Sequence, residues 1–287
     1  MVTEGKILAA KVISGVQVTR KVREELRVKI ATLRKKGIAP GLAIVVLKNP
    51  AARVHVARLK ERACRQLGIK CKVHCLPENT TKEEFIQLLK QLNTAPEIHG
   101  INIHPLPPHF NLTSVSQLVA PNKDIEGLHF QNMGNLCKDS PPLIPYVAKG
   151  IMKLIETTGV NLENKQAVVV GRSELVGKPV AALLLNKRVI VSICHSQTID
   201  LVSFTKRADL LVVATGNPRL ITAEMVKKGA IVIDVGVNLT GTRLVGDVDY
   251  WGVEKVAGWI TPVPGGVGPV TISMLLTNLL DRAARSS

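Results

Sequence analysis

Aromatic residues are scarce in this 287-residue sequence, at 3% of the chain. Proteins that bind single-stranded nucleic acid stack bases on aromatic rings, so the scarcity argues against that class and leaves aliphatic side chains to build the core. Cysteine is scarce too, and the five cysteines are an odd number, which favours reduced thiols inside a cell over a disulfide framework. Cys71, His74 and Cys75 are too compact and too few for a usual four-ligand zinc site.

Long apolar runs are also missing. No stretch reaches the ~18 residues that a membrane span needs. The segment MVTEGKILAAKVISG has neither the length of a secretory core nor the Arg- and Ser-rich composition of a transit peptide. We therefore expect a cytoplasmic protein with no membrane partner, or one of the mitochondrial matrix if a transit peptide has been removed.

Positive charge, in contrast, is in excess. The sequence has 38 Lys and Arg against 22 Asp and Glu, a net charge of +16, which attracts anionic small molecules and polyanions. The cations recur along helix surfaces, as over residues 19–37, rather than in one patch or tail. We expect no nucleic-acid partner, although the charge alone leaves that alternative open.

The order of apolar patterns predicts two α/β domains. In the first half, helical periodicity alternates with strand-like apolar runs, which predicts a largely parallel sheet. The expected helices cover residues 18–36, 53–67 and 80–92, and the expected strands cover residues 42–47, 69–76 and 100–109, the last ending in a proline-rich loop. Thr81 and Glu84 form a capping-box pattern at the start of the third helix.

The second half repeats this rhythm more clearly. Four short apolar strands separated by helices predict a doubly wound, Rossmann-type sheet. They cover residues 166–171, 188–194, 209–216 and 230–237, and a last helix is expected over residues 272–284.

A glycine-containing turn follows the first of these four strands. In VVVGRSELVGKP, Gly171 stands where the chain must turn, and Gly177 where the next helix must come close, so that backbone N–H groups can face a pyrophosphate. Ser173 stands where G-x-G-x-x-G has its middle glycine. A plain strand-to-helix turn would have the same pattern.

The second strand of this half ends without an acidic residue. NAD-dependent enzymes place a carboxylate there for the ribose 2′-hydroxyl, whereas a 2′-phosphate needs cations and hydroxyl donors. Here the strand leads into His195 and Ser196, and Arg172 lies in the preceding loop. This favours NADP as the cofactor, unless His195 and Ser196 merely finish the strand.

Several motifs occur together in one order: NKDIEGL, VVVGRSELVGKP, VVATGNP, IDVGVN, VGDVD and TPVPGGVGPVT. The sequence resembles the tetrahydrofolate dehydrogenase/cyclohydrolase family over nearly the whole chain. The resemblance implies a bifunctional enzyme acting on 5,10-methylenetetrahydrofolate and a homodimer. It implies a folate-site catalytic domain at residues 1–148, joined by the C-terminal helix 272–287, and an NADP-binding domain at residues 149–271. It extends the cofactor site to Thr215, Gly216, Val237 and Thr271.

The segment TPVPGGVGP combines residues of opposite conformational freedom. Proline fixes φ, while glycine permits conformations closed to other residues. With the resemblance, we expect Pro264, Gly265 and Gly266 to form a rigid wall between cofactor and folate. A tight connection into the last helix is the alternative.

The resemblance places the catalytic lysine at Lys60, counted back from the pair Gly68 and Ile69. In a helix, Lys60 shares an apolar stripe with Val56, Ala63 and Leu67. Desolvation there would lower its pKa and suit it to proton transfer. A lysine whose stem packs on the core while its head reaches water has the same pattern.

The tyrosine that the family has four residues before this lysine is absent. Val56 holds that position, and a shift of one residue would bring His55 there but leave Leu59 in place of the lysine. One register of the helix therefore cannot place both His55 at the tyrosine position and Lys60 at the lysine position. We expect His55 and Val56 to lie beside the substrate.

Three further positions depart from the family pattern. His104 stands for a glutamine, Glu126 in KDIEG for an aspartate, and residues 145–148 for a Pro-Cys-Thr-Pro stretch. We expect Lys60, His104 and Glu126 to carry catalysis, with hydrolysis impaired more than hydride transfer because it also needs proton transfers. The alternative is a catalytically silent relative that keeps nucleotide binding and dimerisation.

Overall fold

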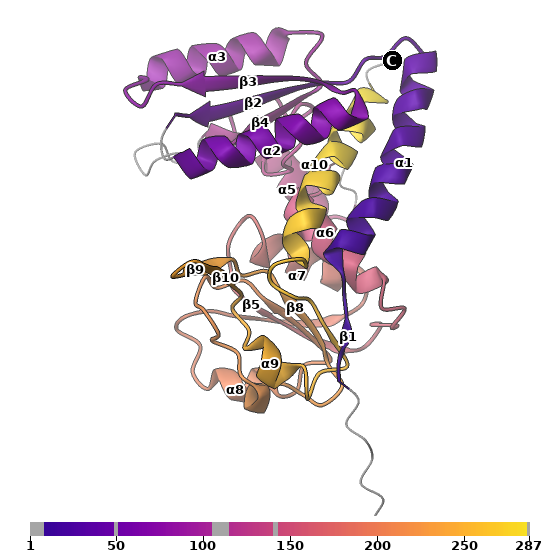
Figure 1. Ribbon diagram of the computed structural model, residues 1–287, viewed down its shortest axis with the longest axis vertical. Helices are drawn as coiled ribbons and strands as arrows, with labels where there is room; N and C mark the ends of the chain where they lie inside the picture. Colours follow the sequence, from indigo (N-terminus) through magenta and orange to yellow (C-terminus); the bar gives the residue numbers. More distant parts are fainter. Residues whose placement is uncertain (1–8, 49–50, 105–114, 140–142, 286–287) are drawn as a thin grey trace, which may run out of the picture. The chain divides into compact units, whose positions relative to one another are not determined.

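The computed structural model describes residues 9–48, 51–104, 115–139 and 143–285 (Figure 1). The chain forms two compact units. One contains Lys21–Tyr146 and the described residues from Ile272 onward, and is called here the three-stranded unit. The other contains the described residues up to Arg20 and Val147–Thr271, and is called the six-stranded unit.

The three-stranded unit is built on a parallel sheet of order β3-β2-β4. The strands are β2 (Gly41–Leu47), β3 (Lys70–Leu76) and β4 (Gly100–Ile103). Helices α2 (Ala51–Leu67) and α3 (Lys82–Thr94) lie on opposite faces of this sheet (Figure 1). Every residue of β2 is buried, which explains its unbroken apolar sequence.

Local signals in the sequence set the ends of these helices. The predicted capping box is confirmed: Glu84 N donates to Thr81 Oγ1 (3.2 Å), and Thr81 N donates to Glu84 Oε2 (2.8 Å). Helix α2 ends before Gly68, whose φ of +68° favours glycine. Helix α5 (Phe130–Cys137) also belongs to this unit. The predicted proline-rich loop after β4 lies outside the described residues.

The six-stranded unit is a parallel sheet of order β1-β11-β8-β7-β5-β6. The four predicted strands are β5 (Gln166–Val170), β6 (Ile190–Cys194), β7 (Leu210–Val213) and β8 (Ile231–Asp234). The other two, β1 (Lys11–Val12) and β11 (Trp259–Ile260), have two residues each, too few to show a periodicity. The predicted fold class, two α/β domains of which the C-terminal one is doubly wound, is confirmed.

The connections of this sheet place its ligand crevice. The chain passes from β5 to β6 on one side and then returns to β7 on the other side of β5. In doubly wound sheets, ligands bind at the carboxyl ends of the strands where the order reverses. That point is the end of β5, directly before Gly171.

The remaining elements are short, apart from two long helices at the ends of the chain. They are α6 (Tyr146–Glu156), α7 (Gly177–Asn186), α8 (Leu201–Thr205), the 3₁₀ turn η1 (Ala223–Met225), the hairpin of β9 (Asn238–Thr240) and β10 (Arg243–Val245), and α9 (Tyr250–Val253). Helices α1 (Gly15–Lys35) and α10 (Val267–Ala283) contribute residues to both units. Among the described residues, no helix has the length and hydrophobicity to span a bilayer.

Candidate functional site

A cavity of about 530 Å³ opens where the strand order reverses in the six-stranded unit. Three residues of the predicted turn, Gly171, Arg172 and Ser173, line it together with Ser196 and Thr215. All five were predicted to bind the cofactor, so the structure brings this part of the predicted site together. His195, which the sequence placed at the end of the second strand, lines the cavity too. The lining also includes residues that the prediction did not include: Val170, Thr198, Leu201, Ala214, Asn217 and Leu220.

Two glycines shape the floor of this cavity. Gly171 has a φ of +129°, and a Cβ there would lie 2.3 Å from the carbonyl oxygen of Ala214. A Cβ on Gly177, at the start of α7, would lie 2.0 Å from the carbonyl oxygen of Gly171. Only glycine permits this close approach of helix and turn, which leaves the first N–H groups of α7 directly beside the turn.

Ser173 has a local role in addition to lining the cavity. Its hydroxyl oxygen accepts hydrogen bonds from the backbone N–H groups of Val176 (3.2 Å) and Gly177 (3.5 Å). These N–H groups begin α7, where a helix lacks partners of its own. The side chain that replaces the middle glycine of the motif therefore caps the helix.

The side of the cavity beyond β6 has hydroxyl donors and a cation but no carboxylate among its described lining residues. Ser196 and Thr198 lie in a tight turn, in which Thr198 N donates to His195 O and His195 N donates to Thr198 Oγ1, both at 2.9 Å. Arg172 reaches the same cavity. This chemistry suits a phosphate on the ribose 2′ position rather than a free hydroxyl.

A buried aspartate holds the loop after β7, and the sequence analysis missed it. Asp247 is fully buried, and its Oδ2 accepts from Thr215 N (2.6 Å), Thr215 Oγ1 (2.9 Å) and Gly216 N (2.9 Å). Its Oδ1 accepts from Asn238 Nδ2 (2.8 Å). Thr215 and Gly216 are thus fixed at the cavity by Asp247. The VGDVD segment was the available signal, because an acidic residue inside an apolar stretch requires buried donors.

A second buried aspartate supports the first. Asp234, at the end of β8, accepts from the backbone N–H groups of Gly236, Asp247 and Val248, each at 3.0 Å. Burial raises the pKa of Asp234 to about 6, although these three hydrogen bonds act in the opposite direction. The pair forms a rigid polar support beneath the β7 loop.

The remaining residues of this unit that were predicted to bind the cofactor are not among the described residues that line the cavity. Val237 is 62% exposed in the loop before β9, and Thr271 Oγ1 donates to Gly268 O (2.7 Å) within α10. Gly266 packs tightly, since a Cβ there would lie 2.6 Å from Pro262 O. Their roles, and those of Pro264 and Gly265 toward the folate, stay predictions.

A buried polar chain crosses the three-stranded unit. Lys60 on α2 is 6% exposed, and its Nζ donates to Oδ1 of Asn102 on β4 (2.8 Å). Asn102 is fully buried, and its Nδ2 donates to Glu126 Oε1 (2.6 Å). The second carboxylate oxygen of Glu126 accepts from Ile103 N (3.3 Å). Two predicted catalytic residues are therefore joined by Asn102, which the sequence analysis missed.

Burial moves the pKa values of both ionisable ends toward neutrality. It lowers the pKa of Lys60, while the charge of Glu126 opposes this shift. It raises the pKa of Glu126 to about 7, while Lys60 opposes and Asp124 adds to the rise. A buried lysine whose pKa is lowered, linked through an amide to a carboxyl group whose pKa is raised, is suited to acid–base catalysis.

The KDIEG segment separates structural from functional side chains. Lys123 Nζ donates to the carbonyl oxygens of Leu92 (3.0 Å) and Ala95 (2.6 Å) at the end of α3. Asp124 accepts from Gly127 N (3.1 Å), His129 N (2.7 Å) and Asn132 Nδ2 (2.8 Å), which closes the turn. Lys123 and Asp124 therefore hold the shape of the segment. Glu126 instead accepts a hydrogen bond from Asn102, which is also the partner of Lys60.

The three predicted histidine and valine positions differ in their surroundings. His104 is 3% exposed at the end of β4, two residues beyond Asn102, and its backbone N donates to Val45 O (2.9 Å). His55 and Val56 lie on α2 with exposed side chains. Only Val56 stands one turn before Lys60 on the same helix face.

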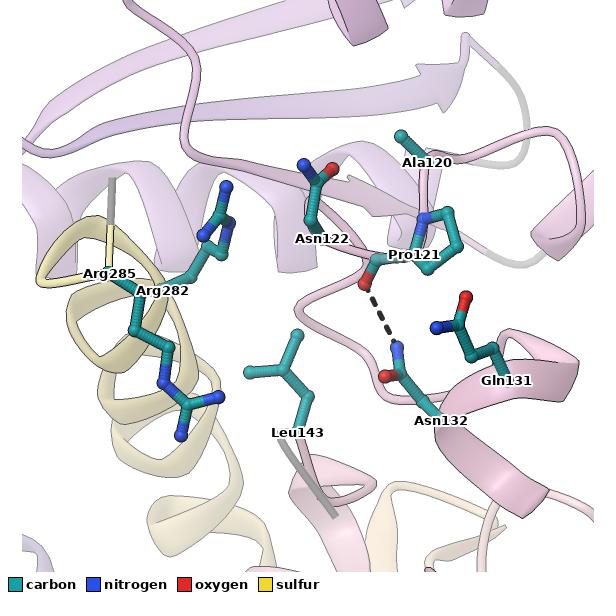
Figure 2. Close-up of a pocket in the computed structure, with 8 residues that line it drawn as sticks. All are labelled: Ala120, Pro121, Asn122, Gln131, Asn132, Leu143, Arg282 and Arg285. Atoms are coloured by element: carbon teal, nitrogen blue, oxygen red, sulfur yellow. Dashed lines mark hydrogen bonds between the residues drawn. The ribbon is translucent and has the colours of Figure 1, made fainter. Parts of the chain in front are cut away.

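A second cavity, of about 440 Å³, lies elsewhere in the three-stranded unit. Figure 2 shows Arg282, in the last turn of α10, and Arg285 just after it, on one side of the cavity, with Gln131 and Asn132 on the other. Asn132 Nδ2 donates to Pro121 O (3.1 Å) across its rim. None of the predicted site residues lines it.

Comparison with known proteins agrees with the geometry of both units. Residues 13–126 match the catalytic domain of tetrahydrofolate dehydrogenase/cyclohydrolase, and residues 145–287 match its NAD(P)-binding domain. The bifunctional protein FolD of Nitrosospira multiformis is 48% identical over 282 residues, covering 97% of this chain and 98% of that protein.

Solved structures lead to the same family. The FolD methylenetetrahydrofolate dehydrogenase/cyclohydrolase of Campylobacter jejuni has a TM-score of 0.94 and 40% identity, over 96% of this chain and 99% of that one. The enzyme of Trypanosoma brucei, solved with NADP cofactor and an inhibitor, has a TM-score of 0.92 and 37% identity, over 97% and 99%. The chain belongs to the tetrahydrofolate dehydrogenase/cyclohydrolase family.

Proposed function

We propose that this protein is a bifunctional enzyme that oxidises 5,10-methylenetetrahydrofolate to 5,10-methenyltetrahydrofolate and hydrolyses the product to 10-formyltetrahydrofolate. The observation that carries the proposal is the buried chain from Lys60 through Asn102 to Glu126. This chain places a lysine with a lowered pKa and a carboxyl group with a raised pKa inside the unit that matches the family's catalytic domain. We assign the folate site to the three-stranded unit and the cofactor site to the six-stranded unit, which also contains the described residues 9–20 that the sequence had placed in the folate domain.

The residues of the six-stranded unit fit NADP. The lack of a Cβ on Gly177 lets the start of α7 approach the backbone of Gly171, and Arg172, Ser196 and Thr198 offer donors for a 2′-phosphate. When bound, NADP supplies the hydride acceptor. The chain itself binds and orients the cofactor through these groups and the loop fixed by Asp247.

Lys60 and its neighbours serve the hydrolytic step in this proposal. With a lowered pKa, the amine of Lys60 exchanges a proton with the reacting centre, and Glu126 holds the pterin ring by its carboxyl group. His104, buried directly after the strand that carries Asn102, is a second acid or base for water activation. Because this step depends on more proton transfers than oxidation does, we expect dehydrogenase activity to exceed hydrolysis.

One assay with matched variants tests this function. Purified protein is mixed with 5,10-methylenetetrahydrofolate and NADP, and the absorbance of NADPH and of the methenyl product is followed. Turnover by the wild type that Lys60→Met reduces, but that Lys90→Met leaves intact, supports the proposal. Lys90 is the matched control because it is an exposed lysine on α3. NADP binding without any turnover would support the silent relative instead.

We further propose a homodimer formed through strand β6, in a cytoplasmic protein without nucleic-acid or membrane partners. In the described sheet, β6 is an edge strand that pairs with β5 alone, and Ile190 is 57% exposed on it. An exposed apolar edge strand is a natural pairing surface. Light scattering should show a dimer that Ile190→Lys dissociates. Leu239→Lys, at a residue 72% exposed on β9, should leave the dimer intact.

A further inference from the structure

The Lys60 ammonium group has an aromatic neighbour from a distant part of the chain. Tyr146, the first residue of α6, places its ring centroid 5.8 Å from Lys60 Nζ. This distance lies within the range in which a cation is attracted to the face of a ring. Burial and the nearby charge of Glu126 raise the pKa of Tyr146 well above its ordinary value, so the phenol stays neutral and the ring remains an electron-rich partner.

The backbone just before Tyr146 is held in place by α10 and by the Glu126 segment. Asn278, fully buried on α10, donates from Nδ2 to the carbonyl oxygens of Ile125 (2.9 Å) and Ile144 (2.7 Å). A Cβ on Gly127 would lie 2.6 Å from the backbone nitrogen of Pro145. The segment that carries Glu126 and the segment that carries Tyr146 are therefore in backbone contact. The two side chains reach the same site from these neighbouring segments.

Four groups surround the ammonium group from four parts of the unit. Asn102 on β4 accepts one of its hydrogen bonds, Glu126 follows Asn102, Cys64 lies one turn further along α2, and Tyr146 comes from α6. A lysine ammonium has three donors. The amide of Asn102 fixes the direction of one, and the ring of Tyr146 limits rotation of the group on a second side.

We propose that Tyr146 is a positioning residue for Lys60, whose ring holds the ammonium group against Asn102. The long lysine side chain would otherwise adopt several rotamers, because Asn102, the acceptor of its hydrogen bond, is an uncharged amide. With the ring present, the amine points to one place before and after Glu126 changes its protonation state. This inference depends on the proposed function only for its effect on catalysis.

The test separates the ring from the hydroxyl and from side-chain volume. Position 146 is replaced by phenylalanine, and by pentafluorophenylalanine, which has nearly the same size but a reversed ring quadrupole. The pKa of Lys60 is read by NMR of ¹⁵N-lysine-labelled protein, with Lys123 as an internal reference. Tyr146→Leu is added, with its folding checked by circular dichroism.

We expect Tyr146→Phe to leave the pKa of Lys60 unchanged, and the pentafluoro ring to lower it by about one pH unit, because cation–π attraction favours the charged amine. The pKa of Lys123 should not move in either protein. Equal values of the Lys60 pKa with the two rings would overturn the proposal. So would a fall in Tyr146→Phe as large as that with the pentafluoro ring, since that result would assign the effect to the hydroxyl.

A kinetic measurement on the same proteins connects the ring to catalysis. Hydrolysis should keep its kcat in Tyr146→Phe and lose about tenfold with the pentafluoro ring, while KM stays within twofold, because a displaced amine affects the reaction more than binding. An unchanged kcat with the pentafluoro ring would refute the catalytic part. If the wild type shows no turnover, the proposed function fails, while the NMR result still decides whether the ring positions Lys60.

Discussion

The cofactor site makes a sharp prediction at Gly177, which a single methyl group should disrupt. In Gly177→Ala, the new Cβ would lie 2.0 Å from Gly171 O and 3.0 Å from the Cα of Arg172. Neither contact can be relieved by a flexible side chain, because both partners are backbone atoms. To bring the first contact to about 3.4 Å, an ordinary van der Waals distance, the start of α7 must retreat by roughly 1.4 Å.

The size of the effect follows from that retreat. Overpacking of this kind costs about 1 to 3 kcal/mol, and it falls on the N–H groups that would face the pyrophosphate. If the cofactor restores the original geometry, it must supply this energy on binding. The affinity for NADP should therefore fall by about tenfold to a hundredfold, at roughly 1.4 kcal/mol for each factor of ten.

Isothermal titration of NADP into the variant measures this loss directly. Gly134→Ala is the matched control, because a Cβ on Gly134 meets no atom within 4 Å and the residue lies inside α5. That variant should bind NADP like the wild type and gain about 0.5 to 1 kcal/mol of stability from the better helix former. A Gly177→Ala protein that is folded by circular dichroism and binds NADP with wild-type affinity would refute the assignment of the turn to the pyrophosphate.

Three further predictions concern charged groups. Arg172→Ala should weaken NADP binding by about 1 to 3 kcal/mol and leave NAD binding within twofold, whereas equal losses for both would place the guanidinium elsewhere. Lys60→Met should abolish hydrolysis in a methenyltetrahydrofolate assay, while His104→Gln leaves it unchanged or improves it, because glutamine restores the family residue that His104 replaces. Surviving hydrolysis in Lys60→Met would show that the wrong lysine has been chosen. Because burial raises the pKa of Glu126 from 4.5 to about 7, the folded state binds its proton more tightly than the unfolded state. The wild type should therefore lose up to about 3 kcal/mol of unfolding free energy relative to Glu126→Gln as the pH rises from 4.5 to 7, and urea titrations that show parallel pH profiles would contradict this.

The sequence predicted the cofactor half well because its physics is local. Strands buried on both faces are continuous apolar runs, and the turn after β5 needs glycine where φ is +129° and where α7 comes close. Both requirements leave a pattern within a few residues. Asp247 left none that we used, because its partners at Thr215 and Gly216 are 32 and 31 positions away and two of the three donors at these residues are backbone groups.

The folate half shows the limit of motif counting. Counting back from Gly68 predicted Lys60 correctly as a buried residue, but Asn102 was included in the apolar run GINI and Tyr146 was noted only as a departure from the family pattern. Asn102 was detectable in principle, since a lone amide in a fully buried strand must have buried partners. Tyr146 was not, because its contact with Lys60 depends on Gly127, Ile144 and Asn278 bringing remote segments together.

The energetics of the buried chain distinguish an active enzyme from a silent relative. Removing a lysine and a carboxylate from water costs several kcal/mol for each ion, and apolar residues of similar volume are often as stable or more stable in such places. The sheet does not need the hydrogen-bonded side chains of Lys60, Asn102 and Glu126, since β4 is paired to β2 through its backbone. A unit kept only for dimerisation would gain stability by losing Lys60, Asn102 and Glu126. Proton transfer near neutral pH, in contrast, requires an amine with a lowered pKa beside a carboxyl group that titrates at about 7. The residues whose burial lowers the stability of the fold are the residues that the proposed reaction needs. This favours the active enzyme over the silent relative.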